Sequence, residues 1–247
     1  MTSRTPDATL IYAIGDLHGR LDLLDDMHRR IEADVRLRTA PNRQVVYLGD
    51  YVSRGTDSPG VVERVLKWLP EGFERIALKG NHEDLLLRFI DGDIATGRHW
   101  FDYGGLDTLA AYGVAIEDHP ARDDASVGKL RECLVAALPP SHLAFFRALG
   151  VRHRTGDYCF VHGGIRPGIA LDQQSDHDCM WIRGRFLDSD AEHGAIIVHG
   201  HSISATPVVR PNRIGIDTGA YRSGVLTCLV LEGERRSFLQ TAIPDRS

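Results

Sequence analysis

Short apolar runs alternate along the first third of the chain with stretches in which apolar residues recur at helical spacing. The runs at residues 8–15, 44–49 and 75–79 predict buried strands, and residues 20–35, 61–69 and 81–90 predict helices. Before the second helix, Ser58 and Pro59 have the character of an N-cap and a first helical residue. This βαβαβα order predicts a mainly α/β fold.

The pattern changes beyond residue 93. Residues 94–120 are rich in aromatic residues and glycine and contain a short helical patch at 106–112, and two more helices are predicted at 129–138 and 141–149. Strands dominate afterwards, at residues 158–161, 195–198, 213–216 and 225–232. We find no linker or repeat, so we predict one domain over residues 1–247, with a mainly helical insertion around 94–150.

Composition narrows the functional classes. The 247 residues are 43% apolar and 26% charged, as in ordinary globular proteins, and the net charge of -5 is spread among both signs. The sequence has no stripe of basic residues that would indicate nucleic-acid binding. Its four cysteines include no CxxC pair, which argues against a zinc ribbon or a disulfide framework. The polar start of the chain and the lack of a bilayer-length apolar run predict a cytoplasmic protein without membrane contact.

Five short blocks of possible metal ligands lie at the ends of apolar runs. They are Gly15-Asp16-Leu17-His18-Gly19, Gly49-Asp50-Tyr51-Val52-Ser53-Arg54-Gly55, Gly80-Asn81-His82-Glu83, His162-Gly163-Gly164 and His199-Gly200-His201. The carboxyl ends of strands in α/β sheets line the ligand crevice, so these side chains should converge. Asp16 and His18 are two apart, so an extended backbone would point both the same way. Carboxylate, imidazole and amide ligands suit a centre of two divalent metals that activates water.

Each block has a structural alternative when it is taken alone. Asp16 would serve equally as a cap for the helix that follows it, and His162 or His199 would serve as a hydrogen-bonded structural histidine. The occurrence of all five blocks at strand ends favours a catalytic centre.

The order GDLHG, GDYVSRG, GNHE, HGG and HGH resembles the phosphoprotein phosphatases, a family of calcineurin-like metallophosphoesterases, over residues 15–201. The tail from Gly215 to Ala220 resembles small bacterial members, of the serine/threonine phosphatase type. The resemblance implies a four-layer α/β/β/α sandwich with two metals between the sheets. The implied ligands are Asp16, His18 and Asp50 for one metal and Asp50, Asn81, His162 and His199 for the other, with Asp50 bridging. Manganese is favoured, and iron or zinc also fits such ligands.

The resemblance also implies the remaining roles. His82 would be the general acid and Arg54 a phosphate ligand, with Arg183 as a second phosphate clamp. Arginine forks suit the charged oxygens of phosphate, although Arg185 and Lys79 are nearby cations. We place Asn81 and Tyr221, with Asp217, along the substrate pocket, and we assign His201 to the surroundings of the metals rather than to their ligands.

Ser53 departs from the pattern. Protein phosphatases of this family usually carry aspartate there, where it resembles an orienting partner of the GNHE histidine. Serine accepts one hydrogen bond and supplies no charge, so it stabilises an imidazolium less. Symmetric diadenosine tetraphosphate hydrolases resemble this chain in lacking that aspartate.

Three functions follow from these observations. The first is a metal-dependent phosphatase acting on phosphoserine or phosphothreonine in proteins. The second is a symmetric dinucleoside tetraphosphate hydrolase, which takes a small phosphorylated substrate. The third is a phosphate-binding scaffold without catalysis, which the retention of every ligand candidate and of His82 disfavours.

Overall fold

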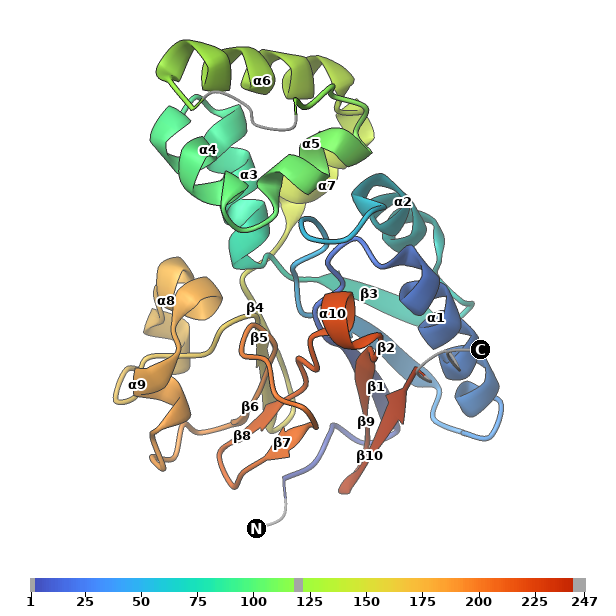
Figure 1. Cartoon of the computed structure of the whole chain (residues 1–247). Coiled ribbons are helices and arrows are strands. Elements are labelled where there is room, and N and C mark those ends of the chain that lie inside the picture. The colour runs from blue at the N-terminus through green and yellow to red at the C-terminus, as the bar shows by residue number, and fades with distance from the viewer. Residues whose placement is uncertain (1–2, 118–121, 242–247) are drawn as a thin grey trace.

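A computed structural model describes residues 3–117 and 122–241, which form two five-stranded sheets (Figure 1). The first has the order β10-β9-β1-β2-β3, built from β1 (Thr9–Ile14), β2 (Asn42–Tyr47), β3 (Phe73–Ala77), β9 (Thr227–Glu232) and β10 (Arg235–Gln240). The second has the order β4-β5-β6-β8-β7, built from β4 (Arg152–Thr155), β5 (Tyr158–Val161), β6 (Ile196–His199), β7 (Val208–Val209) and β8 (Arg213–Gly215).

Strand β1 shows how the layers form. Successive strand residues point to opposite faces of a sheet. Leu10, Tyr12 and Ile14 pack in one core cluster with α1 (Leu21–Val35) and α2 (Ser58–Lys67), whereas Ile11 and Ala13 pack in a second cluster with residues of the other sheet. A third cluster joins that sheet to α8 (Asp176–Trp181) and α9 (Gly184–Leu187). The predicted four-layer α/β/β/α sandwich is therefore confirmed.

A group of helices stands above the sheets (Figure 1). It comprises α3 (Asn81–Ile90), α4 (Ile94–Phe101), α5 (Gly105–Ala111), α6 (Asp124–Ala137) and α7 (Pro140–Ala148). The chain leaves the first sheet after β3 and returns beside it, because Gly150 forms a parallel bridge with Leu78. The N-terminus of α3 therefore stays at the ends of the strands while the later helices project away from them. The remaining short elements are a 3-10 turn (Leu171–Gln173) and α10 (Ala220–Ser223).

Several predicted elements have different bounds in the structure. Asp57, not Ser58, caps α2, because its side chain accepts a hydrogen bond from the Gly60 amide at 2.8 Å. Helix α6 begins at Asp124, five residues before the predicted start, where Asp123 caps it. The pattern did not predict α4, α8, β4 or β10, which are short or alternate weakly. Within the described residues, the helices are too short or too polar to cross a bilayer.

Candidate metal centre

The five ligand blocks meet at one edge of the sandwich. Strands β1, β2 and β3 run parallel to one another, as do β5, β6 and β8, so their carboxyl ends share an edge within each sheet. The first four blocks follow β1, β2, β3 and β5 directly or after a short loop, and the last begins with His199, the final residue of β6. Topology thus brings together residues that are up to 185 positions apart in the chain, as the contact of His201 with Asp16 shows.

Asp50 lies at the centre of this cluster. Its carboxylate oxygens are 3.3 Å from His18 Nε2, 3.4 Å from His162 Nε2 and 3.9 Å from His82 Nε2. Two sets of possible ligand atoms each lie within 4.8 Å of one another, namely those of His18, Asp50 and His82 and those of Asp50, His162 and His201. Asp50 belongs to both sets, which is the arrangement that a carboxylate bridging two cations requires.

Backbone carbonyls set the tautomers of two histidines. His18 Nδ1 lies 2.9 Å from Val52 O, and His162 Nδ1 lies 2.9 Å from Leu48 O. Since a carbonyl only accepts, each Nδ1 must carry the proton, and each Nε2 presents a lone pair toward Asp50. Metal-binding histidines commonly donate their other N–H in this way. The two rings are thus already in the form that binds a cation.

Asn81 and Asp16 complete the cluster. Asn81 Oδ1 lies 2.9 Å from His162 Nε2, and Asp16 Oδ1 lies 4.0 Å from His162 Nδ1. The expected extended backbone between Asp16 and His18 is not what aligns them, because β1 ends at Ile14 and His18 has a φ of 43°. A turned loop, rather than strand alternation, brings both side chains to the same edge.

The structure brings His201, and not His199, into the ligand sets. His199 Nδ1 lies 3.0 Å from Gly200 O, and its ring packs edge-on against Phe186 at 5.1 Å. His201 instead follows a turn, with a φ of 61°, and its amide donates to Asp16 Oδ2 at 3.0 Å. The Nε2 atoms of His199 and His201 are both buried without a hydrogen-bond partner among the described residues, so their place relative to Asp50, and not the missing partner, separates the two histidines.

Backbone strain concentrates in these blocks. Positive φ is uncommon for residues other than glycine and costs energy that the surrounding structure must offset. The described chain has six such residues, which are Ala8, His18, Asp50, Ser53, Arg54 and His201. Five of the six belong to the ligand blocks, and this clustering supports a functional site.

Burial sets the protonation of the cluster. It lowers the pKa of His18 to about 3, of His162 to about 4 and of His201 to about 2, so these imidazoles are neutral at pH 7. Burial also raises the pKa of Asp50 to about 7, and burial with nearby Asp217 raises the pKa of Asp16. Neutral imidazoles can bind divalent cations directly, and bound cations would stabilise the ionised form of the closely spaced carboxylates.

Glu83 has a role that the family resemblance of the motifs did not assign, although this residue ends the GNHE block. Its Oε1 accepts hydrogen bonds from the amides of Tyr51 at 2.8 Å and Val52 at 3.2 Å. Its Oε2 accepts from the amides of Asp50 and Gly80, both at 2.9 Å. One buried carboxylate therefore fastens the loop that carries Asp50 to the start of α3. A glutamate within a ligand block was the available signal.

Two arginines border the cluster. Arg54 Nη2 lies 3.3 Å from His82 Nε2, and its guanidinium stacks over the Tyr221 ring at 4.7 Å. Arg183 Nη2 lies 3.4 Å from His201 Nδ1, which distinguishes it from the neighbouring Arg185. The predicted phosphate ligands thus reach the ligand sets from two sides, with Tyr221 packed against one of them.

Ser53 does not face His82. Its hydroxyl accepts a hydrogen bond from Trp100 Nε1 at 3.0 Å, and its amide donates to Thr108 Oγ1 at 2.9 Å. His82 Nδ1 is buried, and no partner for it occurs in the described part of the chain. The position that carries aspartate in protein phosphatases is therefore directed into the helical group, away from the histidine.

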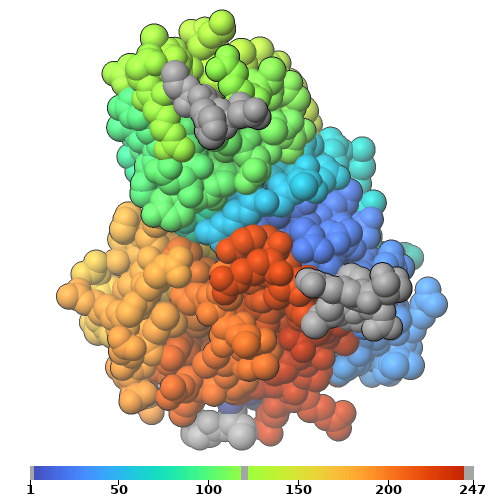
Figure 2. Space-filling model, viewed as in Figure 1, coloured from blue at the N-terminus to red at the C-terminus, as the bar shows by residue number. Residues whose placement is uncertain are grey.

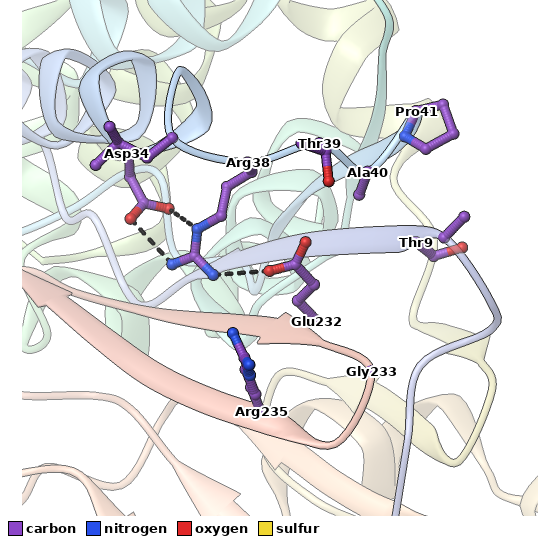
Figure 3. A pocket seen from close by; sticks show the side chains of 11 residues that line it. Thr9, Asp34, Arg38, Thr39, Ala40, Pro41, Glu232, Gly233 and Arg235 are labelled. Atoms are coloured by element: carbon purple, nitrogen blue, oxygen red, sulfur yellow. Dashed lines mark hydrogen bonds and ion pairs between the residues drawn. The ribbon is translucent and has the colours of Figure 1, made fainter.

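A cavity of about 690 Å³ lies at the other end of β1, beside Thr9 (Figure 3). Three of its charges are already paired, because Arg38 reaches both Asp34 and Glu232. Its place, remote from the strand ends that carry the ligands, separates it from the metal centre.

The sandwich and its shared carboxylate define a metal-dependent phosphoesterase. The sequence model of the calcineurin-like phosphoesterases matches residues 9–222, and the chain belongs to this family. It is 30% identical over 237 residues to the asymmetrical bis(5'-nucleosyl)-tetraphosphatase PrpE of Anoxybacillus flavithermus, with 87% of this chain and 88% of the relative covered. It is also 30% identical over 162 residues to the symmetrical bis(5'-nucleosyl)-tetraphosphatase of Acidovorax sp., covering 64% of this chain and 44% of that one.

Structural comparison supports the same fold. A protein provisionally called a diadenosine tetraphosphatase superposes with a TM-score of 0.63 at 17% identity, covering 98% of this chain and 99% of its own. Both sequence relatives are named as dinucleoside tetraphosphatases rather than as the serine/threonine phosphatases predicted first.

Proposed function

We propose that this metallophosphoesterase hydrolyses dinucleoside polyphosphates, with dinucleoside tetraphosphates as its main substrates. The observation that carries the proposal is the orientation of Ser53 away from His82. The names of the two relatives support it independently. The second of the predicted functions thereby replaces protein dephosphorylation as the leading one.

The argument concerns the leaving group. Hydrolysis of phosphoserine expels an alkoxide, a strong base that needs a proton from a general acid as it departs. Cleavage of a phosphoanhydride expels a nucleotide phosphate, which is stable as an anion. His82 Nδ1 has no carboxylate partner within the described residues, and nearby Arg54 further disfavours a charged ring. A site with such a weakly supported proton donor suits the anhydride better than the alkyl ester.

The ligand residues fit two divalent cations, which when bound would polarise the phosphoryl oxygen and supply hydroxide as the nucleophile. We assign Asp16, His18 and Asp50 to one cation. Asp50 would also bind the other cation, together with Asn81, His162 and His201. In this second set His201 takes the place first given to His199. The proximity of His201 to Asp50 and His162 supports this choice, since His199 lies outside that ligand set. Manganese as the native metal and a cytoplasmic location stay predictions.

The chain's own cations would hold the substrate. Arg54 and Arg183 approach the ligand sets from two sides, so they can bind the reacting phosphoryl group and the adjoining phosphates of one polyphosphate substrate. Stacking on Tyr221 would keep the Arg54 guanidinium in place before the substrate arrives. His82, between Arg54 and Asp50, would orient the phosphoryl group more than donate a proton.

The experiment compares two substrates under the same conditions. Manganese-loaded protein should hydrolyse diadenosine tetraphosphate with a kcat/KM at least about 100-fold above that for a phosphoserine peptide, as expected from a difference of about 3 kcal/mol in transition-state stabilisation. Chromatography of the nucleotides would distinguish two ADP from AMP plus ATP. A higher kcat/KM for the phosphopeptide would restore the protein phosphatase hypothesis, and inactivity on both with metal bound would favour the scaffold.

A further inference from the structure

A groove of about 380 Å³ lies between the helical group and α8. Figure 2 shows the green segment of α4 and α5 beside the light-orange segment of α8. Residues of α3 and α4 form one side of the groove and residues of α8 form the other; among them are Leu85, Arg88, Thr96, His99, His177 and Trp181. Its size falls in the range of small-molecule sites.

Aromatic rings face this groove from both sides. On α8, the rings of His177 and Trp181 are nearly parallel, with 14° between their planes and 6.1 Å between centroids. His99 lines the opposite side from α4. The Trp181 indole is held in place, because its Nε1 donates to Asp84 Oδ2 on α3 at 3.3 Å. Preorganised flat rings on two sides suit a planar aromatic ligand.

The groove adjoins the phosphate side of the metal centre. Trp181 precedes Arg183 by two residues, and Arg183 contacts His201. Asp84, the partner of Trp181, follows His82 by two residues at the start of α3. A ligand whose phosphates lie against Arg183 would therefore carry its next chemical group toward Trp181. In a nucleotide, that group is the nucleoside.

We infer that the groove between α4 and α8 is a nucleobase subsite, in which His99, His177 and Trp181 stack on the base of a bound nucleotide. This inference rests on the proposed function. It adds a binding site for the base, by which the protein would select nucleotides over inorganic polyphosphates. Stacking tolerates any base because every base has a π face, so the subsite distinguishes nucleotides from base-free phosphates rather than one base from another.

Arg88 adds a cation to the same groove. It pairs with Asp93 at 2.6 Å, and Asp93 caps α4 by accepting from the Thr96 amide at 2.9 Å. Arg88, Asp93 and His99 all line the groove. Arginine planes stack on bases as aromatic rings do, which strengthens the same selectivity.

The test measures binding without requiring cleavage of the proposed substrate. ATP and inorganic tripolyphosphate are compared as competitive inhibitors of p-nitrophenyl phosphate hydrolysis by the manganese-loaded protein. The wild type should bind ATP about tenfold more tightly than tripolyphosphate, as expected for base stacking. Trp181→Leu and the double variant His99→Ala/His177→Ala should reduce this ratio to near one.

Two controls make the result specific. Trp181→Phe keeps an aromatic face and loses the N–H together with part of the ring area, so it should retain most of the ratio. Leu37→Ala, at a side chain that is 83% exposed and borders the remote cavity, should leave the ratio unchanged. A wild-type ratio near one, or a ratio that survives Trp181→Leu, overturns the subsite.

Its failure is distinct from failure of the proposed function. Absence of diadenosine tetraphosphate hydrolysis together with the expected inhibitor ratios would leave the nucleobase subsite standing. If the variants weaken inhibition by a phosphopeptide and not by ATP, the groove binds peptide and the inference is overturned.

Discussion

Substitution of His201 and His199 by asparagine, one at a time, separates the two candidates for the last metal ligand. Asparagine keeps a polar group near the position of Nδ1 and removes Nε2. The Nε2 atoms of both histidines are buried without a partner in the described chain, but His201 lies in a ligand set, whereas His199 lies outside both sets and packs on Phe186. We therefore expect His201→Asn to weaken one cation and His199→Asn to leave both bound.

The size of the effect follows from the ligand count. Structural zinc sites with four protein ligands bind with ~10–16 kcal/mol, so one ligand contributes roughly 3 to 4 kcal/mol. One cation of His201→Asn should then bind ~10²–10³-fold more weakly. His199→Asn removes part of a buried ring, and the fit against Phe186 should suffer by about 1 to 3 kcal/mol of folding stability instead.

Manganese titration by calorimetry, with elemental analysis after gel filtration, measures the stoichiometry of both variants. Urea unfolding in EDTA measures their metal-free stability, which His201→Asn should change less than His199→Asn. Two tightly bound ions in His201→Asn beside one in His199→Asn would refute the assignment and return the ligand role to His199.

Four further outcomes are expected. Asp50→Asn should remove most activity and weaken both cations, because Asp50 is shared by both ligand sets, and elemental analysis showing unchanged affinity would contradict this. Arg54→Ala should lower kcat/KM by ~10–100-fold through lost charged hydrogen bonds while metal content stays at two ions; loss of metal would instead indicate a structural role. Ser53→Asp should leave the high-pH limb of kcat unmoved and lower stability by several kcal/mol, since the new carboxylate would be buried beside Trp100; an upward shift of that limb would show that position 53 reaches His82. Metal-free protein should lose ~1 kcal/mol of unfolding free energy between pH 7.5 and 9, because burial raises the pKa of Glu83 to about 8. In this range the folded protein still holds a proton that the unfolded chain has already released, so stability falls as the pH rises until Glu83 ionises. Urea titrations that show a rise would refute this, and manganese should reduce the loss.

Much of the fold was predictable because it depends on local pattern. Helix α3 and strand β5 have the bounds that periodicity predicted, and the order of strands and helices in the first third indicated the sheet. The positions of Asp16, Asp50 and Asn81 after apolar runs were enough to place them at strand ends. Hydrophobic spacing and turn chemistry are properties of neighbouring residues, and a sequence displays them directly.

Tertiary structure alone decided which atoms meet. His199 and His201 are two residues apart, so alternation would send both the same way, and only the turn at His201, with its positive φ, sends that ring to Asp50. The direction of Ser53 depends on Trp100, which is 47 residues away. The groove beside the metal centre exists because the fold brings α4 and α8, which are distant in the sequence, to its two sides. Contacts between distant segments depend on the packing of the whole chain, so local pattern cannot supply them.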